Sequence, residues 1–124
     1  MKVILNLAIM FQLMEGKKKT DIDALEWAIK GEKNGAGEIL LTSMNADGTK
    51  LGYDIELTNQ ISSELSIPVI ASGGAGKPID MVRVLKEGMA SAVLAASIFH
   101  FGIYSIENVK KEMLKYTIPV RRTW

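Results

Sequence analysis

Small polar residues and glycines follow three short apolar runs of the chain, where they could bind an anion. The runs and the residues that follow them are 39–41 with Thr42 and Ser43, 67–71 with Ser72, Gly73, Gly74, Ala75 and Gly76, and 92–96 with Ser97. Glycine lets a backbone approach a ligand closely, and the N-terminus of a following helix adds partial positive charge. Several backbone amides could therefore hold a phosphate after the second run.

A glycine-rich turn does not by itself indicate a site, because a tight connection from a strand to a helix also requires glycine. The recurrence of hydroxyl residues after all three runs favours a shared site. The carboxyl ends of neighbouring parallel strands lie at one edge of a sheet, so these residues would point at one spot.

Three residues could carry acid or base chemistry. Asp54 is expected to cap a helix, which leaves Asp47, next to Gly48, as the better candidate carboxylate. His100 is the only histidine and stands between Phe99 and Phe101. We interpret it as a packed, hydrogen-bonded residue, because a general base would also need a partner that the sequence does not identify. With one histidine and no cysteine, no metal site, disulfide, thiol nucleophile or cofactor is expected.

Helical patterns separate the three apolar runs, which predicts an α/β fold with parallel strands and right-handed crossovers. The helices are expected from a Thr20 cap to Asn34-Gly35, from Asp54 to Leu65, from Pro78 to Gly88, and from a Ser105 cap onward. Helical spacing predicts their apolar sides, which are Ile55, Ile61 and Leu65 for the second helix, Met81, Val82 and Leu85 for the third, and Ile106, Val109 and Met113 for the fourth. Trp27 lies off the apolar stripe of the first helix and is expected to pack at its flank.

Length and composition predict one domain, residues 1–124, with a single core: the chain has 124 residues, of which 48% are hydrophobic. A formal net charge of +1 gives no attraction to nucleic acid, and residues 17–19 are a solvated lysine run. Residues 3–14 are apolar but are interrupted by Asn6 and Gln12 and are too short to span a membrane as a helix. We expect an N-terminal strand or hairpin over residues 1–15, and a cytoplasmic protein.

Three segments together resemble the cyclase subunit of imidazole glycerol phosphate synthase, an enzyme family of histidine biosynthesis. They are GAGEILLTSMNADGTKLGYD at residues 35–54, IPVIASGGAGK at 67–77 and AVLAASIFHF at 92–101. The resemblance runs from about Gly16 to near the C-terminus. The sister isomerase of the pathway has a similar Ser-Gly-Gly loop, but LTSM followed by DGTKLGYD points to the cyclase. The resemblance implies the C-terminal half of a (βα)8 TIM barrel, about strands 5–8.

The resemblance also implies a function and its site. The family condenses ammonia with a phosphoribulosyl formimino aminoimidazole carboxamide ribonucleotide to make imidazole glycerol phosphate, and a partner glutaminase subunit supplies the ammonia through the barrel. Thr42 corresponds to a strand-end residue near the substrate, and Glu38 to a charged residue near the ammonia entrance. The residues that correspond to half of the family's phosphate-binding site are Asp47, Gly48, Ser72, Gly73, Gly74, Ala96 and Ser97.

The chain departs from the family in ways that affect catalysis. A complete barrel has eight strands and about 250 residues. The family's two catalytic aspartates lie on strands 1 and 5, and strand 1 has no counterpart here. The strand 5 position falls near Met1, and residues 1–14 contain no acid. Asn45 stands where many members carry aspartate. We therefore expect no catalytic residue on this chain.

Two functions from different classes stay open at this point. The chain could be an enzyme subunit, either a piece of the cyclase or one part of a split barrel whose N-terminal half supplies the acids. It could instead be a catalytically silent half-barrel that binds phosphate esters and self-associates. Both share one expectation: a sheet of three or four strands cannot close, so its edges and one apolar face need a partner. We expect a homo-oligomer, or a complex with an N-terminal half-barrel.

Overall fold

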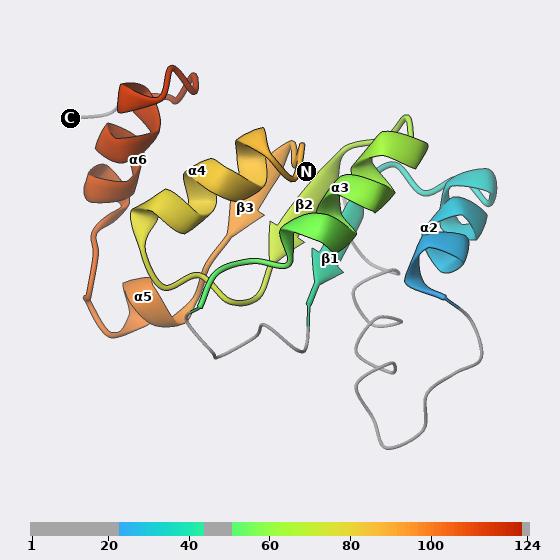
Figure 1. Ribbon diagram of the computed structural model, residues 1–124, viewed down its shortest axis with the longest axis horizontal. Helices are drawn as coiled ribbons and strands as arrows, with labels where there is room; N and C mark the ends of the chain where they lie inside the picture. Colours follow the sequence, from blue (N-terminus) through green and yellow to red (C-terminus); the bar gives the residue numbers. More distant parts are fainter. Residues whose placement is uncertain (1–22, 44–50, 123–124) are drawn as a thin grey trace.

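The computed structural model describes residues 23–43 and 51–122, and it alternates helices with strands as the sequence predicts (Figure 1). The elements in chain order are α2 (Ala24–Lys33), β1 (Ile39–Thr42), α3 (Ile55–Glu64), β2 (Val69–Ser72), α4 (Pro78–Lys86), β3 (Ala92–Leu94), α5 (Ser97–His100) and α6 (Ile106–Lys115). The short helix α5 was not predicted. The expectations for the Thr20 cap, the lysine run and residues 1–15 lie outside the described residues.

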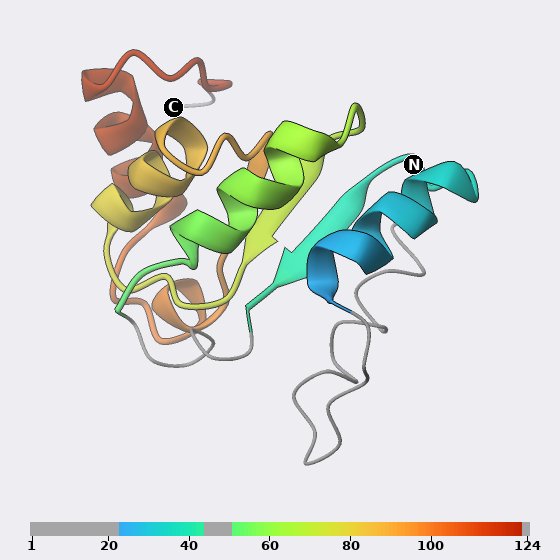
Figure 2. The same cartoon turned by 45° about the vertical axis from the view of Figure 1, so that its right-hand side comes forward.

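The three strands form one parallel sheet in the order β1-β2-β3. Leu40 pairs with Ile70, and Ile70 pairs in turn with Ala92. Helix α3 lies against β2 and α4 lies against β3 (Figures 1 and 2). The predicted parallel α/β arrangement is thereby confirmed, and all the strands present their carboxyl ends at one edge of the sheet.

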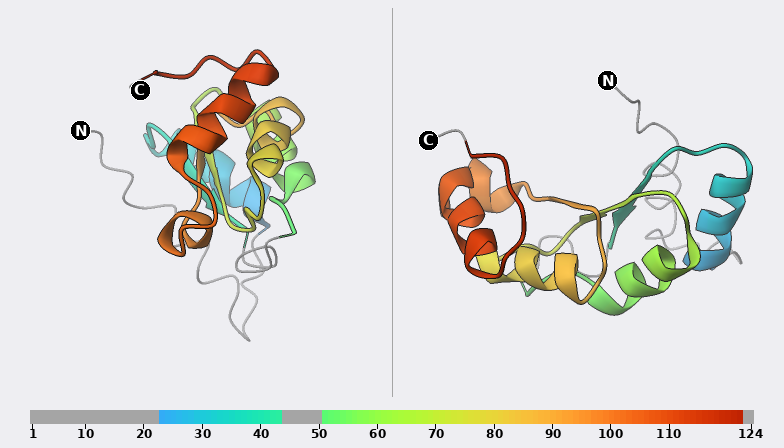
Figure 3. Two further views of the ribbon diagram at one scale, coloured as in Figure 1. Left: turned by 90° about the vertical axis from the view of Figure 1, so that its left-hand side faces the viewer. Right: turned by 90° about the horizontal axis from the view of Figure 1, so that it is seen from above.

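The two faces of this sheet have different surroundings. Ile39, Leu41, Val69 and Ala71 are buried, whereas the residues that alternate with them are only half-buried or exposed. Seen from above, the helices lie along the outer side of a curved arrangement of strands (Figure 3). We call the other face the concave face and define it by the alternating set Leu40, Thr42, Ile70, Ser72, Ala92 and Leu94. The helices of the described chain therefore cover one face of the sheet only.

Two groups of apolar side chains make the core between the sheet and its helices. One joins α4 and α6 through residues such as Met81, Val84 and Met113, and the other joins α2 and α3 to β1 and β2 through residues such as Ala28 and Ile61. Most of the predicted inward residues of α3, α4 and α6 and of their ends are buried, namely Ile61, Leu65, Met81, Val82, Val109 and Met113. The predicted residues Ile55 and Leu85 are half-buried and pack against the core. Val84 was missed although it is fully buried.

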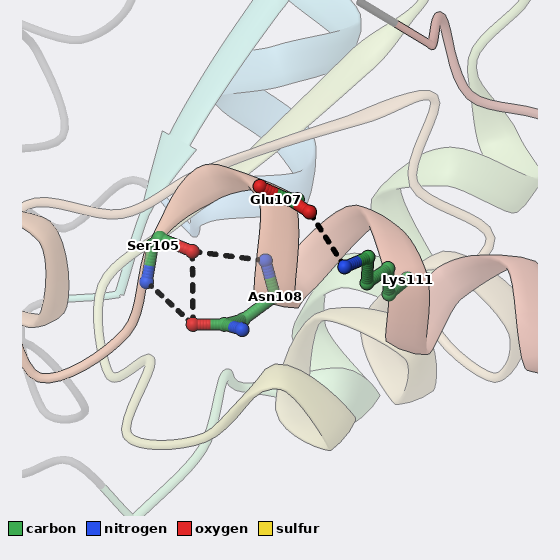
Figure 4. A network of polar contacts seen from close by, with 4 residues as sticks. All are labelled: Ser105, Glu107, Asn108 and Lys111. Atoms are coloured by element: carbon green, nitrogen blue, oxygen red, sulfur yellow. Dashed lines mark hydrogen bonds and ion pairs between the residues drawn. The ribbon is translucent and has the colours of Figure 1, made fainter. Parts of the chain in front are cut away.

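Side-chain caps begin two of the predicted helices. Asp54 accepts a hydrogen bond from the Leu57 amide at 3.1 Å, which confirms its predicted role. Ser105 accepts one from the Asn108 amide, also at 3.1 Å, while the Asn108 side chain accepts one from the Ser105 amide (Figure 4). Such reciprocal bonds satisfy amides that the first helical turn leaves open.

Ile106 is the exception in the predicted stripe of α6, because its side chain is 60% exposed. It occupies the first position of the helix, directly after the Ser105 cap. A helical side chain leans toward the N-terminus of its helix, so a residue at the first position projects past the packed middle. The expectation that Ile106 faces the core is wrong, whereas Trp27 packs at its helix flank as predicted, with the Lys30 Nζ 5.6 Å from its ring centre.

None of the helices in residues 23–43 and 51–122 is long and apolar enough to cross a membrane.

Substitution of Gly88 tests how tightly α4 is packed. A Cβ atom on Gly88 would lie 2.6 Å from the Val84 carbonyl oxygen and 3.0 Å from Val84 Cγ2. Gly88→Ala should therefore lower the free energy of unfolding by about 1–3 kcal/mol, as overpacking typically does. Urea denaturation followed by circular dichroism measures this change.

Gly37→Ala is the matched control, because a Cβ atom there would meet no atom within 4 Å and no positive φ opposes a side chain. It should leave stability unchanged or raise it by less than about 1 kcal/mol. Equal losses in both variants would contradict the close packing at Gly88.

Candidate functional site

Thr42 and Ser72 lie next to each other at the carboxyl edge of the sheet. They are register partners on β1 and β2, both are half-buried, and both belong to the concave face. The Ser43 amide donates a hydrogen bond to the Ser72 carbonyl oxygen at 3.1 Å, which extends the pairing one residue beyond β1. The predicted meeting of hydroxyl residues at neighbouring strand ends is confirmed for these two.

The third strand differs from the prediction. It ends at Leu94, which pairs with Ser72, so Ser97 is not at a strand end but opens α5. Ala96 has φ −120° and ψ −67°, outside the extended region, and its carbonyl oxygen accepts hydrogen bonds from the Phe99 and His100 amides. The strand thus ends two residues earlier than the apolar run indicates. Ala96 is exposed and Ser97 is half-buried.

Gly73 and Gly74 form the sharp turn after β2. Their φ angles are 93° and 104°, a conformation that residues with a side chain rarely adopt, and both are buried. The Gly74 carbonyl oxygen accepts a hydrogen bond from the Gly52 amide at 2.8 Å. The segment that enters α3 is therefore tied to the glycine turn.

A carboxylate of the chain itself, that of Asp80, already binds amides at the start of α4. The Asp80 carboxylate accepts hydrogen bonds from the Gly76 amide at 2.9 Å and from the Lys77 amide at 2.8 Å. The expectation that this helix N-terminus adds amides and charge for a ligand is therefore wrong at these two positions. The signal for Asp80 was present in the sequence, since an acidic residue two places after Pro78 is typical of a self-capped helix.

Sequence reasoning missed Tyr53. Its side chain is 7% exposed, and its hydroxyl donates a hydrogen bond to the Leu94 carbonyl oxygen at 2.8 Å. Burial, and secondarily the Asp80 charge, raises the pKa of the Tyr53 phenol above its ordinary value, so the hydroxyl keeps its proton. Leu51, two residues earlier, is 88% exposed. No local pattern separates these two positions, because the partner of Tyr53 is distant in sequence.

His100 does not occupy the packed position that we predicted. It is exposed on α5 and meets Phe101 edge-to-face, with ring centres 4.9 Å apart. The four-residue helix buries Ile98 instead, and so short a helix has room to bury only one side. The histidine stays a poor candidate for a general base, because the described residues place no carboxylate against it.

Glu38 lies at the opposite edge of the sheet from Thr42 and Ser72. It directly precedes β1, where the Ile39 amide donates to the Pro68 carbonyl oxygen, and it is half-buried. On the same amino-terminal side, Glu32 accepts hydrogen bonds from both the amide and the hydroxyl of Ser66, and these bonds lower the pKa of its carboxyl. These hydrogen bonds at the edge that carries Glu38 therefore involve none of the residues of the glycine turn.

Two predicted residues, Asp47 and Gly48, lie outside the described residues, as does Asn45. Within residues 23–43 and 51–122, no three acidic, histidine or cysteine side chains gather so that they could hold a metal ion. The described part of the candidate site therefore consists of hydroxyls and backbone groups around Thr42, Ser72, Gly73 and Gly74, with Ala96 and Ser97 following the neighbouring strand.

A family model and several curated proteins match the sequence of this chain. The family model described as "Histidine biosynthesis protein" matches residues 8–105. The chain is 61% identical over 106 residues to "Imidazole glycerol phosphate synthase subunit HisF" of Dehalococcoides mccartyi, a match that covers 86% of this chain and 42% of that protein. The HisF subunits of Methanosphaera stadtmanae and Methanopyrus kandleri are 57% and 55% identical, each over 86% of this chain and 39% of the relative.

The chain thus spans about two fifths of the length of the curated relatives it matches. The match includes β1, β2 and β3 and the turns that follow them, which are the elements that form the candidate site. By this match the chain belongs to the histidine biosynthesis protein family, and the relatives it resembles are HisF subunits of imidazole glycerol phosphate synthase.

Proposed function

We propose that this chain supplies the C-terminal half, about strands 5–8, of a (βα)8-barrel cyclase of the HisF type. The complete cyclase would be a lyase that takes ammonia and a phosphoribulosyl formimino aminoimidazole carboxamide ribonucleotide and makes imidazole glycerol phosphate. A glutaminase subunit would supply the ammonia. One observation carries the proposal: a parallel sheet with helices on one face presents a buried Gly73-Gly74 turn in a chain 61% identical to HisF.

The role proposed for this half is to hold one phosphate of the substrate. Thr42 and Ser72 bring two hydroxyls to one edge of the sheet, and the glycine turn beside Ser72 lets a ligand approach the backbone closely. Asp47 and Gly48 complete the site in this proposal, together with Ala96 and Ser97. Donors fixed before the ligand arrives bind an anion at a low cost in conformational entropy.

The described acids near this edge have other tasks. Asp54 caps α3 through the Leu57 amide, and Asp80 caps α4 through two amides. Each carboxylate would have to give up its cap to act on a substrate. We therefore propose that the catalytic acids come from a separate N-terminal half, and that Glu38, at the opposite edge, lies near the ammonia entrance.

The concave face supports a partner of the same architecture. Leu40 and Ile70 are only half-buried there, and Leu94 is 44% exposed at the end of the last described strand. A barrel buries such residues against strands on its far side. We propose that an N-terminal half-barrel covers this face in the enzyme, in the cytoplasm, with residues 1–124 acting as one half-barrel domain.

A second candidate rests on the same exposed face. Two copies of this chain related by a twofold axis could cover each other's concave faces and form a catalytically silent, phosphate-binding homo-oligomer. Sedimentation equilibrium at micromolar concentration separates the two candidates. A stable dimer that an added N-terminal half cannot dissociate favours the silent oligomer.

Complementation tests the proposed enzyme. The purified chain alone should form no imidazole glycerol phosphate from the substrate and an ammonium salt. Addition of the N-terminal half of a HisF relative should produce ammonia-dependent turnover, because the two halves together restore both the acids and the phosphate site. Turnover by this chain alone would contradict the assignment of the acids to an N-terminal half. Binding of the two halves without any turnover would contradict the enzymatic proposal itself.

Phosphate binding is tested by thermal unfolding. Millimolar phosphate should raise the melting temperature of the chain by a few degrees above a chloride control at equal ionic strength, because a ligand that prefers the native state stabilises it by mass action. Gly74→Val should abolish the shift, since valine fits neither the φ of 104° nor a close backbone approach.

Ser72→Ala keeps the backbone and should reduce the phosphate shift through the loss of one hydroxyl. Gly37→Val, at the opposite edge and with nothing near its Cβ position, is the matched control and should keep the full shift. Equal shifts in all four proteins would show that phosphate acts nonspecifically.

A further inference from the structure

Two consecutive residues, Gly52 and Tyr53, hold the two loops that follow β2 and β3. The Gly52 amide donates to the Gly74 carbonyl oxygen at 2.8 Å, and the Tyr53 hydroxyl donates to the Leu94 carbonyl oxygen, also at 2.8 Å. The segment enters α3, yet it reaches across β2 to the end of β3. One short stretch of the chain therefore contacts both the turn after β2 and the end of β3, from which the proposed phosphate donors follow.

The carbonyl oxygen that accepts the Tyr53 hydrogen bond lies where the chain leaves β3. Leu94 is the last residue of β3, and its carbonyl group belongs to the peptide unit that leads through Ala95 into Ala96 and Ser97. A hydrogen bond to that oxygen fixes the orientation of the peptide plane, because the six atoms of a peptide unit move together. The direction in which the chain leaves β3 then depends on where the Tyr53 hydroxyl lies.

Tyr53 itself has little freedom to move. Its ring is buried in the group of side chains that includes Ala75, Met81 and Ile98. Met81 belongs to α4 and Ile98 to α5, so the ring shares its core with both helices that follow the two loops. A buried hydroxyl without a partner is costly, which favours a single position of the Leu94 carbonyl over alternatives.

We propose that Tyr53 is a positioning residue for phosphate binding: with Gly52, it sets the spacing between the Gly73-Gly74 turn and the Ala96-Ser97 segment. This inference rests on the proposed phosphate site. The Tyr53 hydroxyl does not contact the ligand but acts through the Leu94 carbonyl group. Its loss changes the affinity for phosphate in a protein that is still folded.

Tyr53→Phe removes the hydroxyl and keeps the ring. Isothermal titration calorimetry with inorganic phosphate, well below the melting temperature, should give a Kd about five- to tenfold higher than that of the wild type, the usual effect of one lost hydrogen bond. Tyr104→Phe is the matched control, because Tyr104 packs against the same core and has its own tyrosine hydroxyl. It should bind phosphate within about twofold of the wild type.

A merely structural role predicts a different result. Tyr53→Phe would then lower the stability in phosphate-free buffer and leave the phosphate Kd unchanged, which would overturn the inference. In the complemented enzyme, a positioning role raises KM for the phosphorylated substrate by the same factor as the phosphate Kd and leaves kcat unchanged. An unchanged KM with a lowered kcat would also overturn it.

Phosphate binding by the wild type distinguishes a failure of this inference from a failure of the proposed function. If the wild type does not bind phosphate, the proposed function fails and the inference fails with it. If the wild type and Tyr53→Phe bind equally, only the inference fails. If Tyr53→Phe does not fold, the Leu94 carbonyl ¹³C resonance of the wild type decides: it should shift on addition of phosphate, and an unchanged resonance overturns the inference.

Discussion

The burial of one face of a parallel sheet is the constraint on which the rest of this structure depends. Side chains of a strand alternate between the two faces, so the packing of Ile39, Leu41, Val69 and Ala71 under the helices turns Leu40, Ile70 and Leu94 to the concave side. The same alternation places Thr42 and Ser72 together at the carboxyl edge. The candidate site and the partly exposed concave face thus have one physical origin.

Long-range hydrogen bonds then give that edge its shape. The Gly52 amide and the Tyr53 hydroxyl tie the approach to α3 to the ends of both other strands, and Asp80 closes the start of α4. The buried Gly73-Gly74 turn lies between these bonds. In (βα)8 barrels the carboxyl ends of the strands carry the active site, while the other edge contributes stability. The separate Glu32–Ser66 contact at the amino-terminal edge agrees with that division.

Local signals in the sequence predicted much of the fold. Asp54, Pro78 and Ser105 mark helix starts by their cap chemistry, and apolar spacing predicted the buried sides of α3 and α4. The spacing failed where an element is short or ends: β3 stops at Leu94, and α5 leaves His100 exposed. Tyr53 could not be predicted, because its partner lies 41 residues away and only the folded sheet brings them together. The candidate site was located by its glycines and hydroxyls, but not the groups that hold it.

The central claim is that the concave face is the surface on which the other half of the barrel packs, and a thiol probe tests it most directly. The chain has no cysteine, so Leu94→Cys introduces a single thiol at a position that is 44% exposed, and Arg83→Cys introduces one on the outer side of α4 as a control. We expect an added N-terminal half of a HisF relative to slow alkylation of Cys at position 94 by at least tenfold and to leave position 83 unchanged. Equal alkylation rates at position 94 with and without a bound N-terminal half would contradict the account.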